Sequence, residues 1–115
     1  MRTIYNKKTR KKLRELAAIA HERELAAALN TLHEDFAAWQ AGKVDVFELN
    51  DRIHQFHQKT SREIWKLYCY QGHADTLVSR AVKLGYLTED EIGTELVAQL
   101  GPMISYWQED ESDEG

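Results

Sequence analysis

The fold is decided by residues 7–41, which read KKTRKKLRELAAIAHERELAAALNTLHEDFAAWQA. This stretch has neither proline nor glycine, and its alanines favour a continuous helix. A straight helix of this length would measure roughly 50 Å at 1.5 Å per residue. We therefore predict one unbroken helix. The alternative is a break near His21–Glu24, after which the chain folds back.

Apolar side chains lie on two different sides of this predicted helix. The later stripe consists of Leu25, Leu29, Leu32, Phe36 and Trp39, and we expect it to pack on the next helix. The earlier stripe lies about 180° away, counted at 100° per residue. It consists of Leu13, Leu16, Ala17 and Ala20. We predict that the earlier stripe is the interface of a two-fold homodimer. In the alternative, it covers residues 75–100 of its own chain.

Capping signals predict where further helices begin. Asp45 and Thr88 are each followed three residues later by a glutamate, which is typical of a capping box. Gly42 and Gly85 precede these caps at positions that end a helix. Two such signatures in one short chain indicate helices on either side of two tight connections.

Two more breaks complete the predicted arrangement. Gly72 interrupts the middle of the chain, and Gly101 with Pro102 is expected to end the last helix. We therefore predict helices at 7–41, 46–70, 75–84 and 89–100. The fold class is all-α: a long antiparallel helical hairpin plus a shorter C-terminal helical hairpin, in a four-helix arrangement.

Composition limits the class of protein. The chain has 115 residues and a formal net charge of -4, which suits a small globular protein. Its single cysteine cannot form an internal disulfide, and it has neither a signal-like leader nor an apolar run of about 20 residues. We therefore predict a soluble cytoplasmic protein without membrane contact. It would have one helical domain over residues 1–108 and an acidic, disordered tail over residues 109–115.

Residues 1–14 form a basic segment that lacks any acidic side chain. Its candidate anion-binding residues are Lys7, Lys8, Arg10, Lys11, Lys12 and Arg14. This density of cations suits phosphate contacts, so binding of nucleic acid without sequence readout is one hypothesis. The other interpretation is a solvated helix end that neutralises the acidic tail.

Three histidines are the candidates for a metal site. In an antiparallel hairpin His33, His54 and His57 could approach one another, and three imidazoles can hold zinc. The plainer interpretation is that each histidine is structural. Cys69 has no base that the sequence identifies as its partner, and we expect a buried or interfacial thiol. We assign no catalytic residue and no cofactor.

These observations favour a non-catalytic helical interaction module, a homodimer or a binder of another protein, that acts through helix faces and charged termini. A nucleic-acid-associated protein that uses the basic segment is the first alternative. A metal-dependent enzyme built on the three histidines is the second.

Overall fold

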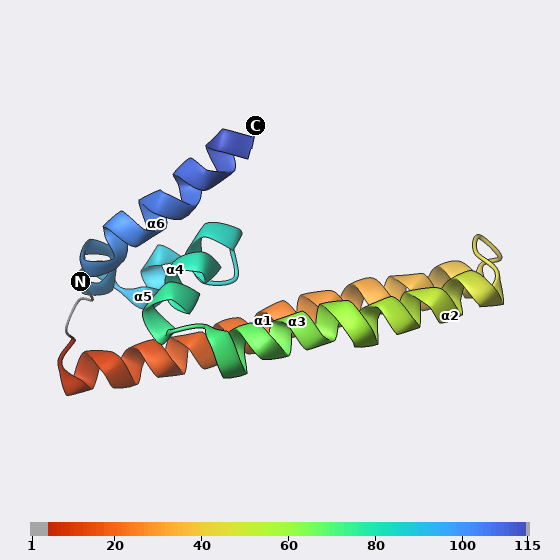
Figure 1. The fold of residues 1–115 in the computed structure, drawn as a ribbon, viewed down its shortest axis with the longest axis horizontal. Helices are drawn as coiled ribbons and strands as arrows, with labels where there is room; N and C mark the ends of the chain where they lie inside the picture. Colours follow the sequence, from red (N-terminus) through yellow and green to blue (C-terminus); the bar gives the residue numbers. More distant parts are fainter. Residues whose placement is uncertain (1–4, 115) are drawn as a thin grey trace. The chain divides into compact units, whose positions relative to one another are not determined.

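The part of the chain that the structure describes is helical almost throughout (Figure 1). The computed structural model describes residues 5–114, with side chains for residues 5–106. No β-strand occurs in the described range, which confirms the predicted all-α class.

Helix α1 (Lys7–Gln40) runs without a break through the stretch that decides the fold. Asn6 caps its first turn, because the side-chain oxygen of Asn6 accepts a hydrogen bond from the Thr9 backbone N–H at 2.8 Å. Gly42 follows the end of the helix with a φ of 77°, a left-handed conformation that favours glycine. The predicted continuous helix is confirmed, and the alternative break near His21–Glu24 does not occur.

A second helical rod spans residues 46–71 and contains two π-helical segments. It consists of α2 (Val46–Gln55), the π-helical segment η1 (Phe56–Ser61), α3 (Arg62–Lys66) and the π-helical segment η2 (Leu67–Gln71). Asp45 caps its start, since the carboxylate accepts a hydrogen bond from the Glu48 backbone N–H at 2.8 Å. A π-helix bonds residues five apart, so each such segment shifts the angular phase of the side chains that follow.

The chain divides into two compact units. The terminal unit combines Met1–Ala20 with Gly72–Gly115, and the hairpin unit is His21–Gln71. Helix α1 supplies its first half to the terminal unit and its second half to the hairpin unit. We predicted one domain over residues 1–108, whereas the packing falls into two groups because the two stripes of α1 pack in different units.

Three helices from the later part of the chain complete the terminal unit. They are α4 (Ala74–Leu84), α5 (Glu89–Ile92) and α6 (Thr94–Glu114), and both α4 and α5 pack on α6. Thr88 and Glu91 form the predicted capping box at the start of α5. The buried apolar residues of this unit are Tyr5, Leu13, Leu16, Ala17, Ala20, Leu77, Val78, Ala81, Leu87, Ile92, Leu96 and Leu100.

Helix α6 continues to Glu114, so the predicted end at Gly101 and Pro102 is wrong. The proline removes one backbone hydrogen bond of the helix. Met103 and Ile104 beyond it are half-buried, and continuing the helix keeps these apolar side chains partly out of water. The helix also includes residues 109–114, where we predicted a disordered tail.

Candidate functional site

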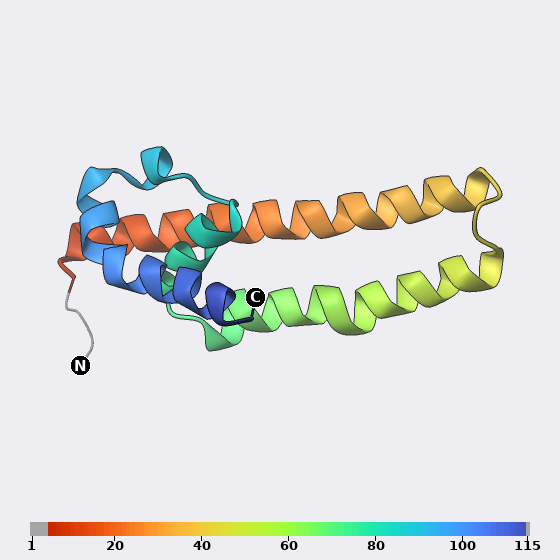
Figure 2. The same ribbon diagram turned by 90° about the horizontal axis from the view of Figure 1, so that it is seen from above.

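The hairpin unit is an antiparallel pair of helical rods, which lie side by side in Figure 2. Asp35 of α1 contacts Arg52, whereas the earlier residue Glu24 contacts the later residue Tyr68. The Tyr68 hydroxyl donates a hydrogen bond to Glu24 Oε1 at 2.7 Å. The ring of His21 stacks on the ring of Tyr68, with 4.7 Å between their centroids. Within this unit the contacts agree with the predicted antiparallel pairing.

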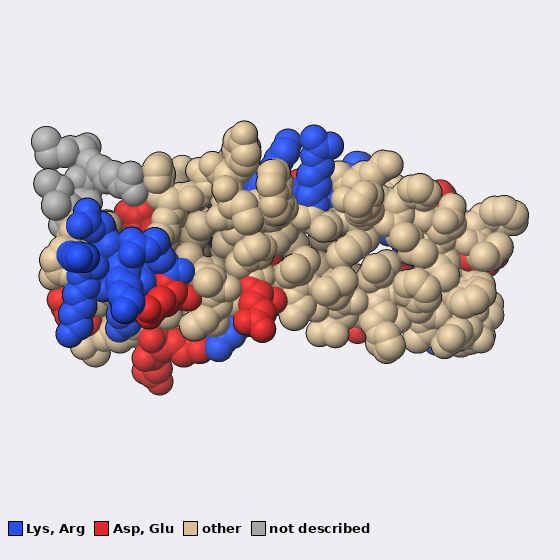
Figure 3. All heavy atoms as spheres, turned by 90° about the horizontal axis from the view of Figure 1, so that it is seen from below, with Lys and Arg blue, Asp and Glu red and all other residues tan. Residues whose placement is uncertain are grey.

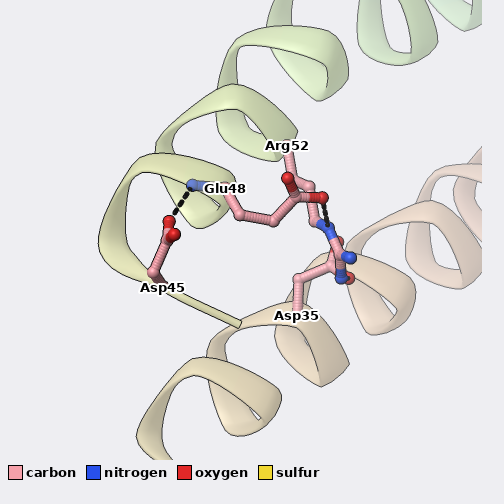
Figure 4. Close-up of polar contacts among 4 residues, drawn as sticks. All are labelled: Asp35, Asp45, Glu48 and Arg52. Carbon is pink, nitrogen blue, oxygen red and sulfur yellow. Dashed lines mark hydrogen bonds and ion pairs between the residues drawn. The ribbon is translucent and has the colours of Figure 1, made fainter. Parts of the chain in front are cut away.

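Arg52 joins the two rods on one side of the hairpin (Figure 4). Its Nη1 donates to Asp35 Oδ1 at 2.8 Å, and its Nε donates to Glu48 Oε1 at 3.1 Å. The hydrogen bond with Asp35, and next that with Glu48, raises the pKa of Arg52 above its ordinary value. The Glu48 carboxylate thus faces Arg52, whereas we predicted that it would cap the backbone N–H of Asp45.

A cavity of about 270 Å³ opens between the rods on the same side as Arg52. Its walls are formed by Ala28, Thr31, Leu32, Asp35, Arg52, Gln55, Phe56 and Thr60. Because Thr31 and Gln55 both line it, the polar flank of α1 and the polar flank of α2 face the same side of the hairpin. The other flanks of the two rods therefore also share a side.

That other flank of α1 is uncharged. Between Leu25 and Gln40 the only charged side chains are Glu34 and Asp35. Both lie about 120° or more around the helix from Leu29, at 100° per residue. The arc around Leu29 therefore carries apolar and neutral side chains only.

The corresponding flank of the second rod is uncharged as well. Val46 and Ile53 are seven residues apart and share one side of α2, and the charged residues of α2 lie about 100° or more from Ile53. After η1, Ile64 is buried, and Trp65 comes one position later, turned about 100° toward the same flank. We define the uncharged face as Leu25, Leu29, Phe36, Trp39, Val46, Ile53 and Trp65.

The uncharged face is only half covered by its own unit. Among the described residues of the hairpin unit, only Leu49 and Ile64 are buried apolar side chains. The large exposed members of the face are Leu29 (47%), Phe36 (39%), Trp39 (39%), Val46 (52%) and Trp65 (52%). Together they leave roughly 400 Å² of apolar surface in water, taking about 150–250 Å² for a large side chain. A patch of this size is typical of a functional surface.

The earlier stripe of α1 is not the free surface that we predicted. Leu13, Leu16, Ala17 and Ala20 are buried within the single chain, at 9% exposure or less. They belong to the terminal unit, which also contains residues 72–114. The prediction of a dimer interface at these four residues is therefore wrong, and the alternative, that its own chain covers the stripe, agrees with the structure.

The six candidate cations of residues 7–14 surround the side of α1 that faces away from this buried stripe, and Arg10 and Lys12 lie nearest to the stripe. All six candidate side chains, Lys7, Lys8, Arg10, Lys11, Lys12 and Arg14, are exposed. Figure 3 shows a dense group of Lys and Arg side chains with acidic side chains beside it. Among the described residues, none of the six forms an ion pair with a carboxylate.

The basic segment destabilises the helix that carries it. Lys7 with Lys11, Lys8 with Lys12, and Arg10 with Arg14 are like-charged pairs four residues apart. Each such pair costs about 0.2–0.5 kcal/mol, and cations at a helix N-terminus also oppose the helix dipole. The clustering therefore does not serve the stability of the helix.

The three histidines weighed as candidates for a metal site do not form one among the described residues. His33, His54 and His57 are exposed, and among the described residues no group of three or more His, Cys, Asp or Glu side chains could hold a metal ion. The flank and solvent positions of the histidines on their helices explain this, since spacing along a sequence does not make side chains converge. Cys69 is exposed, whereas we expected a buried or interfacial thiol.

Comparison with known proteins adds no relative. No protein-family model matches the chain, and neither a curated protein nor a solved structure does. Within the described residues, none of the helices combines the length and the hydropathy needed to span a bilayer. The function is therefore inferred from the two surfaces alone.

Sequence reasoning missed the position of Trp65. Counting at 3.6 residues per turn along the second rod does not place Trp65 beside Val46 and Ile53, because η1 shifts the angular phase between them. The uncharged face itself had a signal in the sequence. Between Leu25 and Gln40 the uncharged arc of the helix is wider than the arc that packing on one neighbouring helix requires.

Proposed function

We propose that this protein is a non-catalytic helical interaction module, which forms a homodimer through the uncharged face of the hairpin unit. The observation that carries the proposal is a face of exposed apolar side chains on a unit with only Leu49 and Ile64 buried among its described apolar residues. A pair of helices with one open apolar side is completed when a second pair covers it, as in a four-helix bundle.

A second copy of the chain is the partner that this surface fits. The face carries no charged side chain, so charge complementarity cannot select its partner. The partner must offer an equally apolar and uncharged surface, and the chain itself supplies one. A two-fold axis sets the face against its own copy and leaves no unpaired face behind.

The exposed apolar area favours association. Two copies would remove about 800 Å² of apolar surface from water, worth about 20 kcal/mol at about 25 cal/mol per Å². Association costs about 4–15 kcal/mol. A micromolar dimer needs a net binding free energy of roughly 8 kcal/mol. The free energy of apolar burial minus the cost of association reaches this value for all but the highest of these costs.

The mass of the full chain in solution tests the proposal. Sedimentation equilibrium should give twice the 13.4 kDa of one chain, with dissociation on dilution. A species of one chain mass at every concentration would contradict it.

The single cysteine and the absence of disulfides are consistent with a cytoplasmic site of action.

A further inference from the structure

We infer that the basic segment of helix α1 binds the phosphate backbone of double-stranded nucleic acid, without reading its base sequence. This inference concerns the terminal unit and does not depend on dimer formation through the hairpin unit. It rests on the density and exposure of the six cations and on the buried side chains that hold their helix in place. It rests also on the lack of exposed aromatic side chains beside them.

The spacing of the cations matches the charge density of a duplex. Lys7 and Arg14 are seven residues apart, which is about 10 Å along a helix. A duplex carries one negative charge per about 1.7 Å of its axis with both strands counted, so the same length holds about six phosphate charges, about three on each strand. Lys7, Lys11 and Arg14 follow one line along the centre of the exposed side.

The helix that carries the cations is held in place by buried side chains. Helix α1 is held by Leu13 within this segment and by Leu16, Ala17 and Ala20 in the turns that follow, all of which are buried. These apolar side chains are therefore committed to the core and cannot enter a lipid bilayer as the apolar face of a surface-bound helix would. What the segment offers a ligand is a rigid row of positive charge.

The described part of the segment lacks an exposed aromatic side chain that could stack on bases. Its one aromatic residue, Tyr5, is buried, and the Tyr5 hydroxyl donates a hydrogen bond to Asp75 Oδ2 at 3.1 Å. Binding of single strands usually relies on exposed aromatic rings, so the segment fits a paired duplex better than an unpaired strand. Cations that contact phosphates position a protein on a duplex but do not select its sequence.

One edge of the basic segment borders acidic side chains. The Lys12 ammonium lies beside Gly93, because a Cβ added at Gly93 would be 3.2 Å from Lys12 Nζ. Helix α5, which carries three carboxylates, ends next to that glycine. An acidic protein segment is the competing ligand for the same cations, and the test below distinguishes it.

The experiment measures how salt weakens binding to a labelled duplex of about 20 base pairs, using fluorescence anisotropy with two unrelated sequences. The two sequences should bind equally, and affinity should fall about 10³-fold between 50 and 200 mM salt. The variant Lys7→Gln, Lys11→Gln, Arg14→Gln should bind more weakly, and its affinity should fall only about 40-fold over the same range. The helix content of the variant should not change, since glutamine is a good helix former.

A matched control removes the same charges from the hairpin unit. Lys43, Lys59 and Arg62 are exposed, and replacing all three by Gln should leave the salt dependence as in the unaltered chain. The inference is overturned if the duplex does not bind at low salt, or if both triple variants behave alike. It is also overturned if polyglutamate binds the segment while the duplex does not. The Leu29→Glu variant should bind a short duplex whether the protein is a monomer or a dimer. Failure of the dimer proposal can therefore be told apart from failure of duplex binding.

Discussion

Replacing Leu29 by glutamate should convert the proposed dimer into monomers without unfolding the chain. Leu29 is 47% exposed, so about half of its transfer free energy, roughly 1 kcal/mol, is left for the interface. A carboxylate placed in an apolar interface costs a further 2 kcal/mol or so, even when partly solvated. Two-fold symmetry places the change twice in the dimer. The loss is therefore about 6 kcal/mol, or about 10⁴-fold in Kd.

Sedimentation velocity over a dilution series measures this change, with Ala27→Glu as the matched control. Ala27 is exposed on the same helix and lies about 160° around it from Leu29, so the control adds the same charge on the other side. Only Leu29→Glu should run as a monomer, and circular dichroism should show equal helix content in all three proteins. If both variants dissociate, or neither does, the uncharged face is not the interface.

Three further changes test the packing of the terminal unit. Leu16→Glu should lower the free energy of unfolding by at least about 3 kcal/mol in chemical denaturation, because Leu16 is buried in its own chain. If the variant instead stays stably folded and a dimer dissociates, Leu16 belongs to a dimer interface. Tyr5→Phe removes the 3.1 Å hydrogen bond to the buried Asp75 carboxylate and should cost about 1–3 kcal/mol, and an unchanged denaturation midpoint would show that this bond does not stabilise the unit. Thr88→Ala removes the oxygen that caps the Glu91 backbone N–H and should cost about 1 kcal/mol, with no effect on duplex binding.

Local features of the fold were predictable because they depend on a few neighbouring residues. The caps at Asp45 and Thr88 and the left-handed conformations of Gly42 and Gly85 follow from side-chain chemistry within one turn. The passage of α6 through Pro102 and the π-helical winding of η1 were not predictable in this way. Both depend on which side chains the rest of the chain buries, and a local pattern carries no information about that.

The candidate site shows the same limit on a larger scale. The change of apolar side along α1 was visible in the sequence, but a periodic pattern locates a stripe without saying which segment covers it. The amount of apolar residue on each side decides the outcome. The segment after Gly72 contributes seven buried apolar side chains to the unit that holds the early stripe, whereas the rod at 46–71 contributes only Leu49 and Ile64 among the described residues. The later stripe is therefore the one left without a full partner. For a long helix with two stripes, comparing the apolar residues available to each half points to the half that stays exposed.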